Sequence, residues 1–317
     1  MTMTKKRKIV VSCAITPVLL LLAGFVFLSS RTSQTELRAQ FSDGQMGCMP
    51  LSGRPIFLEV SPGLKFKVDT GSDLSFITEE DLAYLKSHGC DVEEMIYPVL
   101  GRDGIGDIQF NVRRYRVSIP FHKYECELDS MGHMHYVCDR TSVNMIHNVD
   151  FAPSETGFSV LGMDFLEKFD VEYLQSKNML AFYFEPPMDY EACAELSVSK
   201  SPLDWIYPGH RYYMDIEIDH SAAHNYLDTG VQRAFVKMPT KRAKNMDNMV
   251  RDSISSMRGT YPALIDTAAW LSIGNREGVA YVYYYTNDEE DYAINPLNIF
   301  KLDILMDFPG RRIMMRR

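Results

Sequence analysis

The sequence has no excess of positive charge. Its 33 lysines and arginines are outnumbered by 42 aspartates and glutamates, so the formal net charge is -9. Surfaces that bind nucleic acids are usually basic, so this balance argues against a nucleic-acid-binding protein. Hydrophobic residues make up 46% of the 317 residues, which is enough to bury a core in one large domain or in two of ordinary size. We expect no cofactor.

Cysteine is scarce, and no cysteine or histidine spacing matches a known zinc frame. Five of the six cysteines follow residue 40, and an odd number cannot all pair within one chain. Cys126 and Cys138 are closest in sequence, but the connectivity cannot be read from spacing. The group His133, His135 and Cys138 has side chains that a transition metal could bind. Without a matching frame, we interpret it as a polar insertion and expect no metal.

Only one long hydrophobic run occurs, at residues 9–28, which carry no charge. A helix of this length spans roughly 30 Å, the thickness of the hydrocarbon core of a bilayer. Four basic residues at 5–8 precede the run, against Arg31 and Arg38 after it, which orients the N-terminus to the cytoplasm. A cleaved signal peptide is the alternative, but its apolar region is usually about 7–15 residues long. We therefore expect a single-pass signal anchor, with the rest of the chain periplasmic or extracellular.

The part that follows the anchor is expected to be mainly β. Residues 29–50 are polar and indicate a linker. From there onward, short runs rich in β-branched and aromatic residues predict strands. Two helices are expected as well. The first is capped by Thr78 and stops at Gly89, and the second covers residues 240–257 with an apolar face.

A repeated triplet, Asp-Thr-Gly, is the main functional signal. It occurs in KVDTGSDLSF, residues 67–76, and again 159 residues later in NYLDTGVQRAF, residues 225–235. In both copies an aromatic-aliphatic pair lies seven and eight residues after the aspartate. Alone, either triplet could be a strand-ending turn in which Asp caps and Gly takes a positive φ. The matched pair instead predicts one shared site.

Two carboxyl groups held side by side can hydrolyse an amide. They share one proton, because ionising both is costly. The charged carboxylate takes a proton from a water molecule, and the protonated one donates to the carbonyl oxygen of the substrate, with no covalent intermediate. Glycine allows close backbone approach, and threonine can hydrogen-bond to the opposite loop. The predicted catalytic residues are Asp69 and Asp228, and the predicted loop supports are Thr70, Gly71, Ser72, Thr229 and Gly230.

These stretches resemble the active-site strands of retropepsin-like aspartic proteases. Residues 160–166, Val-Leu-Gly-Met-Asp-Phe-Leu, are similar to the segment that ends such a lobe, and residues 169–182 and 302–315 resemble its closing hairpin. The resemblance implies two pseudo-symmetric β lobes, at residues 51–190 and 191–317. It also implies that Asp69 and Asp228 meet between them, that a hairpin flap covers the cleft, and that the substrate is a peptide or protein. Since one chain carries both halves, we expect activity as a monomer.

Three departures from the family pattern leave a second hypothesis open. Val231 stands where the family usually has Ser, Thr or Ala, whereas the first copy has Ser72. In the second half, residues 294–298 lack the glycine of the lobe-ending segment, and the best flap candidate is residues 101–106. The alternative is therefore a binding or scaffolding module of the same fold with weak or no catalysis.

Overall fold

The computed structural model describes most of the chain after the predicted linker. No helix in these described residues is long and apolar enough to cross a membrane. The anchor expected at residues 9–28 lies outside them. The described residues are 45–52, 56–97, 101–102, 108–109, 112–198, 210–230, 235–239, 243, 246–256, 259–285, 293–297, 299–300 and 302–316.

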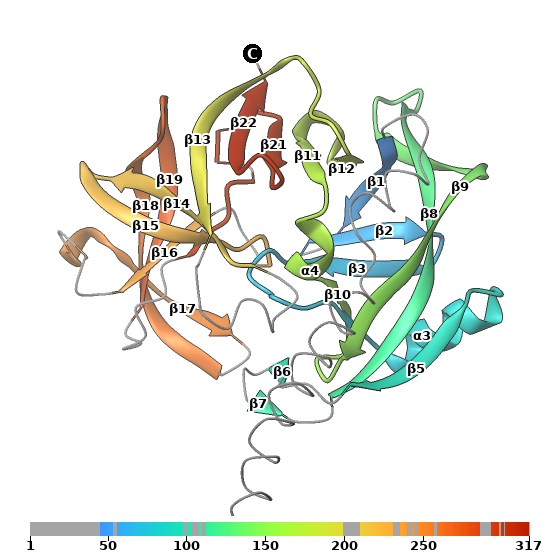
Figure 1. Cartoon of the computed structure of the whole chain (residues 1–317). Coiled ribbons are helices and arrows are strands. Elements are labelled where there is room, and N and C mark those ends of the chain that lie inside the picture. Colours follow the sequence, from blue (N-terminus) through green and yellow to red (C-terminus); the bar gives the residue numbers. More distant parts are fainter. Residues whose placement is uncertain are drawn as a thin grey trace, which may run out of the picture.

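The protein is mainly β, with two lobes that flank a shared antiparallel sheet (Figure 1). Three strands of this central sheet come from each half of the chain, and β11 and β21 meet in the middle, with Val171 opposite Met306. The order across the sheet is β1 (Gln45–Ser52), β12 (Met179–Tyr183), β11 (Asp170–Leu174), β21 (Ile304–Asp307), β22 (Arg312–Arg316) and β13 (Tyr190–Val198).

The first lobe follows β1 and lies on the right of Figure 1. Its long ribbon of β8 and β9 pairs with β5 on one side and continues along β4. Its elements are β2 (Phe57–Ser61), β3 (Leu64–Val68), β4 (Phe76–Ile77), α3 (Glu79–Ser87), β5 (Val92–Tyr97), β6 (Gly101–Arg102), β7 (Ile108–Gln109), β8 (Val112–Leu128), β9 (Met134–Pro153), β10 (Ser159–Leu161), α4 (Met163–Leu166) and the 3-10 turn η1 (Gln175–Lys177).

The second lobe lies on the left of Figure 1 and repeats the strand pairing of the first. In the first lobe β10 runs parallel to β3 and antiparallel to β4. In the second, β20 runs parallel to β15 and antiparallel to β16. The internal repeat predicted from the triplets is therefore present in the topology. The elements of this lobe are β14 (Tyr212–Ile218), β15 (Ser221–Leu227), β16 (Phe235–Pro239), the 3-10 turn η3 (Met246–Asn248), β17 (Val250–Ser256), β18 (Gly259–Ile273), β19 (Arg276–Tyr285) and β20 (Ala293–Ile294).

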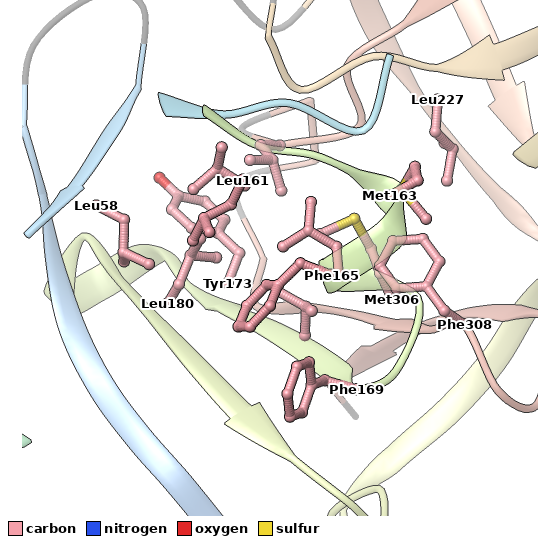
Figure 2. Packing of buried hydrophobic residues seen from close by; sticks show 14 of the residues in the cluster. Leu58, Leu161, Met163, Phe165, Phe169, Tyr173, Leu180, Leu227, Met306 and Phe308 are labelled. Atoms are coloured by element: carbon pink, nitrogen blue, oxygen red, sulfur yellow. The ribbon is translucent and has the colours of Figure 1, made fainter. Parts of the chain in front are cut away.

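One continuous hydrophobic core runs from the first lobe through the central sheet to the second lobe. Figure 2 shows Leu161 and Phe165 of the first lobe beside Tyr173 and Met306 of the central sheet, with Leu227 of the second lobe at the edge of the same cluster. All five side chains are at most 2% exposed. Because β10 and β15 end on this shared core, packing fixes the loops at their ends relative to each other.

The helix predicted after Thr78 is confirmed. The Thr78 hydroxyl accepts a hydrogen bond from the Asp81 backbone N–H at 3.1 Å, and α3 begins at the next residue. Past the end of the helix, Gly89 has a φ of +74°, a conformation that favours glycine. Local capping signals were sufficient here, because both lie within one residue or two of the helix ends.

The second predicted helix, at residues 240–257, is wrong. Its described part contains the short turn η3 and then β17, which pairs with β18 along its whole length. Met246 and Val250, expected on a buried face, are 52% and 55% exposed. The ladder to β18 supplies the backbone hydrogen bonds, so tertiary pairing outweighs a weak local helical pattern.

Other expectations are also corrected by the strands. Residues 45–50, assigned to the linker, belong to β1 of the central sheet. His224 lies within β15 and stacks on Tyr213 with ring centroids 5.1 Å apart. Cys126 and Cys138 are free thiols, and they face Tyr136 and Tyr124, respectively, rather than each other across the β8–β9 ribbon.

Candidate active site

Both Asp-Thr-Gly triplets begin where a central strand of a lobe ends. β3 ends at Val68 and β15 at Leu227, and each following aspartate donates its backbone N–H to the neighbouring strand. The Asp69 N–H bonds the Leu161 carbonyl at 3.1 Å, and the Asp228 N–H bonds the Ile294 carbonyl at 2.9 Å. Ile294 therefore takes the place of Leu161 in the second lobe, although no glycine follows it as Gly162 follows Leu161.

Two buried threonines join the triplets across the lobe interface. The Thr70 N–H donates to the Thr229 hydroxyl at 3.1 Å, and the Thr229 N–H donates to the Thr70 hydroxyl at 3.0 Å. The Thr229 hydroxyl also donates to the Val68 carbonyl at 3.1 Å. Both threonines are at most 1% exposed, so the bonds are shielded from water. The bridging contacts expected of the threonines are thus present in the structure.

The two carboxyl groups lie against the glycine of the opposite loop. A Cβ atom added to Gly71 would lie 2.7 Å from Asp228 Cγ, and one added to Gly230 would lie 2.2 Å from Asp69 Cγ. Neither glycine has a positive φ, so both are required for space rather than for backbone freedom. Within its own loop, each glycine N–H donates to the aspartate Oδ1, at 3.0 Å in the first loop and 3.1 Å in the second. The structure therefore brings Asp69 and Asp228 to one place between the lobes.

Lys67 is a site residue that the sequence analysis missed. Its Nζ lies 2.7 Å from Asp69 Oδ2, and the two side chains are only 14% and 15% exposed. The ammonium also lies 5.6 Å from the centre of the Phe158 ring. The signal was available in the sequence, because side chains two residues apart in a strand point to the same face. Lys67 precedes Asp69 by two residues.

The corresponding position in the second loop holds Tyr226. Its hydroxyl donates to Asp228 Oδ2 at 3.5 Å, and the Arg211 guanidinium lies 5.7 Å from the centre of its ring. Arg211 also donates from Nε to Asp73 Oδ1 at 3.1 Å, which ties the start of the second lobe to the first active-site loop. A cation thus touches one carboxyl and a phenol touches the other.

Ser72 supports its own loop through a hydrogen bond within the turn. Its hydroxyl donates to the Leu74 carbonyl at 2.8 Å and not to Asp69, while its own carbonyl accepts from the Met163 N–H at 2.8 Å. The hydroxyl is therefore a brace for the turn. Val231, its counterpart in the sequence, lies outside the described residues.

A buried carboxyl lies behind the first loop. Asp164 of α4 accepts a hydrogen bond from the Ser75 hydroxyl at 2.6 Å, and the same hydroxyl accepts from the Gly162 N–H at 3.0 Å. Burial raises the pKa of Asp164, and the Ser75 hydrogen bond and the charges of Lys168 and Arg114 oppose this rise without cancelling it. This group braces the segment that carries Asp69.

The remaining candidates from the sequence lie away from the triplets. His133 Nδ1 lies 3.3 Å from Asp129 Oδ2 at the tip of the β8–β9 ribbon, and His135 Nε2 lies 3.3 Å from Glu127 Oε2 nearby. In the described residues, no group of three or more His, Cys, Asp or Glu side chains could hold a metal ion. The flap candidate contains β6, paired with β7, and residues 103–107 lie outside the described residues.

Comparison with known proteins does not assign a family. No protein-family model matches the chain, and no curated protein matches its sequence. Among solved structures, it is similar to the crystal structure of edgp, with a TM-score of 0.45 and 11% identity, over 87% of this chain and 95% of that chain. It is also similar to basic 7S globulin from soybean, with a TM-score of 0.37 and 10% identity, over 86% of this chain and 93% of that chain. Both TM-scores lie below 0.5, so function rests on the geometry of the site.

Proposed function

We propose that this chain is an aspartic endopeptidase in which Asp69 and Asp228 activate a water molecule that hydrolyses a peptide bond. The observation that carries the proposal is the crossed packing of the carboxyls. Asp69 lies against Gly230 of the second loop, and Asp228 lies against Gly71 of the first. A structural turn needs no such placement of two acids at one interface.

The chemistry follows from one proton shared by the two groups. The charged carboxylate takes a proton from the water as the water oxygen bonds to the carbonyl carbon, and the protonated carboxyl gives its proton to the carbonyl oxygen. The carboxyl that gained the water proton then gives it to the amide nitrogen as the carbon–nitrogen bond breaks. The other carboxylate takes a proton back from a hydroxyl of the tetrahedral intermediate, so the pair returns to its starting state. The threonine bonds support this step, since they hold both carboxyls in register while protons move.

The proposal also covers the oligomeric state, the membrane anchor and the substrate of the enzyme. Both active-site loops belong to one chain, and Thr70 and Thr229 join them directly, which supports activity without dimerisation. We include in the proposal the signal anchor at residues 9–28 and a peptide or protein substrate outside the cytoplasm. The likeness to retropepsin-like proteases beyond the two-lobed β architecture is part of this proposal as well.

A binding or scaffolding module without catalysis is the second candidate, and Lys67 is the observation that favours it. Its ammonium occupies one oxygen of Asp69 at 2.7 Å, where an aspartic peptidase requires a carboxylate that can accept a proton from water. The two candidates share the fold and the pair of carboxyls and differ only in whether peptide bonds are cut.

Hydrolysis of a peptide library by the full chain in detergent tests the proposal. We expect the wild type to cut, and both Asp69→Asn and Asp228→Asn to lose about 10²- to 10⁴-fold in rate, the usual contribution of a general acid or base. Asp266→Asn is the matched control, because Asp266 begins the similar triplet Asp-Thr-Ala but lies in β18, where its carboxyl accepts the Ala268 N–H. Equal cutting by all four proteins would exclude the dyad, and no cutting by the folded wild type would favour the binding module.

A further inference from the structure

We propose that the outer face of the β14–β15 hairpin is a docking strip that takes a lysine or arginine side chain of the peptide substrate. The strip begins beside Asp228 and consists of Tyr226, Tyr213, His224, Asp215 and Glu217. The inference deepens the function proposed above and rests on it for cutting, whereas binding of a peptide can be measured without cutting.

Strand alternation places the five side chains of the strip on one face. Residues 213, 215 and 217 of β14 alternate with buried residues of the core, and so do residues 224 and 226 of β15. Tyr213 lies opposite Tyr226, and Asp215 lies opposite His224. The two tyrosines are half-buried and the other three side chains are exposed, so the strip is turned toward solvent.

The aromatic rings of the strip form a row that leads away from Asp228. The Tyr226 hydroxyl donates to Asp228 Oδ2 at 3.5 Å, and the Tyr226 ring meets Tyr213 edge to face, with centroids 6.3 Å apart. Tyr213 then stacks on His224, with only 2° between the ring planes. Because the rings already pack on one another, little side-chain freedom is lost when a ligand binds against them.

Exposed carboxylates make the outer end of the strip negative. The Asp215 side chain is 91% exposed, and its Oδ1 lies 2.7 Å from His224 Nδ1. Glu217 lies two residues further along the same face. Two carboxylates outnumber one histidine, so the strip itself keeps a negative charge even when His224 is protonated. A cation that lies beside such rings and carboxylates is attracted by both.

Arg211 shows how a guanidinium fits surroundings of this kind at the inner end of the strip. Its guanidinium lies 5.7 Å from the centre of the Tyr226 ring, and its Nε donates to Asp73 Oδ1 at 3.1 Å. The stacked rings of Tyr213 and His224, with the Asp215 carboxylate, repeat this combination of ring and carboxylate at the outer end. There the carboxylate is exposed to an arriving peptide.

The matching face of the first lobe has a different charge. Glu59 lies opposite Lys65, as Asp215 lies opposite His224, and both Lys65 and His224 precede an aspartate of the pair by four residues. Lys65 Nζ lies 3.1 Å from Glu59 Oε2, so this carboxylate already has a lysine as its counter-ion. The preference for a basic side chain is therefore expected on the side of the second lobe.

The length of the strip limits where the basic residue lies in the substrate. The four residues from His224 to Asp228 correspond to about 13–14 Å of strand, at about 3.4 Å per residue. An extended peptide has a similar rise, so its lysine or arginine should lie within about four residues of the bond that is cut.

Peptide binding to a form that does not cut tests the docking strip. Fluorescein-labelled pools of peptides of about nine residues, each with Arg, Gln or Glu fixed at one position, are added to full-length Asp69→Asn in detergent, and fluorescence anisotropy is measured. At one position the Arg pool should bind about threefold to thirtyfold more tightly than the Gln pool, because exposed cation–π contacts and ion pairs contribute about this much.

Variants of the strip, made in the same Asp69→Asn protein, should change this order of binding. Asp215→Lys should reverse it in favour of the Glu pool, and Tyr213→Leu should reduce the preference for Arg. Glu59→Gln, at the matching position of the first lobe, is the control and should retain the preference. The unfolding temperature verifies that each variant is folded. Equal binding of the Arg and Gln pools at every position, or an unchanged preference in Asp215→Lys, would overturn the inference.

Cutting separates this inference from the proposed function. A peptide with Arg at the favoured position should be cut by the wild type with a lower KM than its Gln counterpart. Asp215→Asn should raise KM for the Arg peptide more than it lowers kcat, as expected for a contact made equally before and during the reaction. A loss confined to kcat would contradict a docking role. If the wild type does not cut at all, the proposed function fails, while the order of peptide binding still decides whether the strip exists.

Discussion

The two active-site loops share a backbone and differ in the side chains around it. In both, the aspartate N–H bonds the adjacent strand, at 3.1 and 2.9 Å, and the aspartate Oδ1 accepts the glycine N–H, at 3.0 and 3.1 Å. The residue two positions before the aspartate is Lys67 in one loop and Tyr226 in the other. The comparison teaches that the repeat preserves the placement of the carboxyls, while the side chains that contact them are not repeated.

The largest effect on activity and stability should come from filling the space between each glycine and the opposite carboxyl. Gly71→Ala and Gly230→Ala both force a carboxyl to move, and a displacement of about 1 Å can cost about 10²-fold in rate. Overpacking of this kind typically costs about 1–3 kcal/mol of stability. Gly230→Ala should be the more damaging, since its Cβ would come within 2.2 Å of Asp69 Cγ, against 2.7 Å to Asp228 Cγ for Gly71→Ala. Chemical denaturation and peptide cutting measure both effects; full activity in either variant would contradict the crossed packing.

A second, smaller effect is a difference in stability between variants of the two threonines. Thr229→Val removes an acceptor for the Thr70 N–H and a donor to the Val68 carbonyl, whereas Thr70→Val removes an acceptor for the Thr229 N–H. Each buried group left without a partner costs about 1–3 kcal/mol. Urea unfolding should therefore show a greater loss for Thr229→Val than for Thr70→Val. Thr70→Ser and Thr229→Ser keep the hydroxyl and serve as controls. Equal losses of stability in the two Val variants would show that the two threonines contribute equally.

The smallest expected effect is a pH dependence of stability that the first lobe contributes through Asp164 and the second lobe does not. Asp164 follows Leu161 by three residues, and the uncharged Leu297 follows Ile294 by the same number. Burial raises the pKa of Asp164 above its ordinary value of 3.8, so the native state binds this proton more tightly than the unfolded state does. The contribution is fully present below pH 3.8 and is lost as pH rises through the native value.

The unfolding free energy of the wild type and of Asp164→Asn, measured between pH 4 and pH 8, checks this prediction. Asn cannot ionise, so the stability of the wild type relative to the variant should fall as pH rises. A difference that stays constant across this range would mean that Asp164 titrates normally in the native protein. Leu297→Met, at the matching position of the second lobe, should leave the pH dependence unchanged.

Local signals in the sequence predicted local structure well. α3 follows from Thr78 and Gly89, whose contacts lie within the helix and its ends. The helix predicted at residues 240–257 was wrong for the opposite reason. Its apolar periodicity was weak, and the backbone pairing of β17 with β18 determined the structure instead. The same holds for residues 45–50, whose polar composition suggested a linker but whose backbone pairs with β12 in the central sheet.

The site was predictable in part for the same reason. The repeated triplet gives the positions of Asp69 and Asp228 and the need for a small residue after each threonine. The spacing of Lys67 and Asp69 indicates a shared face of one strand, but it does not determine whether the ammonium contacts the carboxyl or solvent. Likewise, the sequence indicated Ser72 as a loop support, and only the structure shows that its hydroxyl donates to the Leu74 carbonyl.

By itself the sequence determined a mainly β chain with two matched Asp-Thr-Gly loops, because strand alternation and turn chemistry are written in neighbouring residues. Only the tertiary structure determined that each carboxyl lies against the glycine of the opposite loop, that Thr70 and Thr229 join the loops, and that Lys67 is buried against Asp69. Those contacts depend on how strands 159 residues apart pack on one core, and on how far water is excluded between them. The strength of the Lys67–Asp69 ion pair depends on that burial, since the same pair in solvent would contribute little.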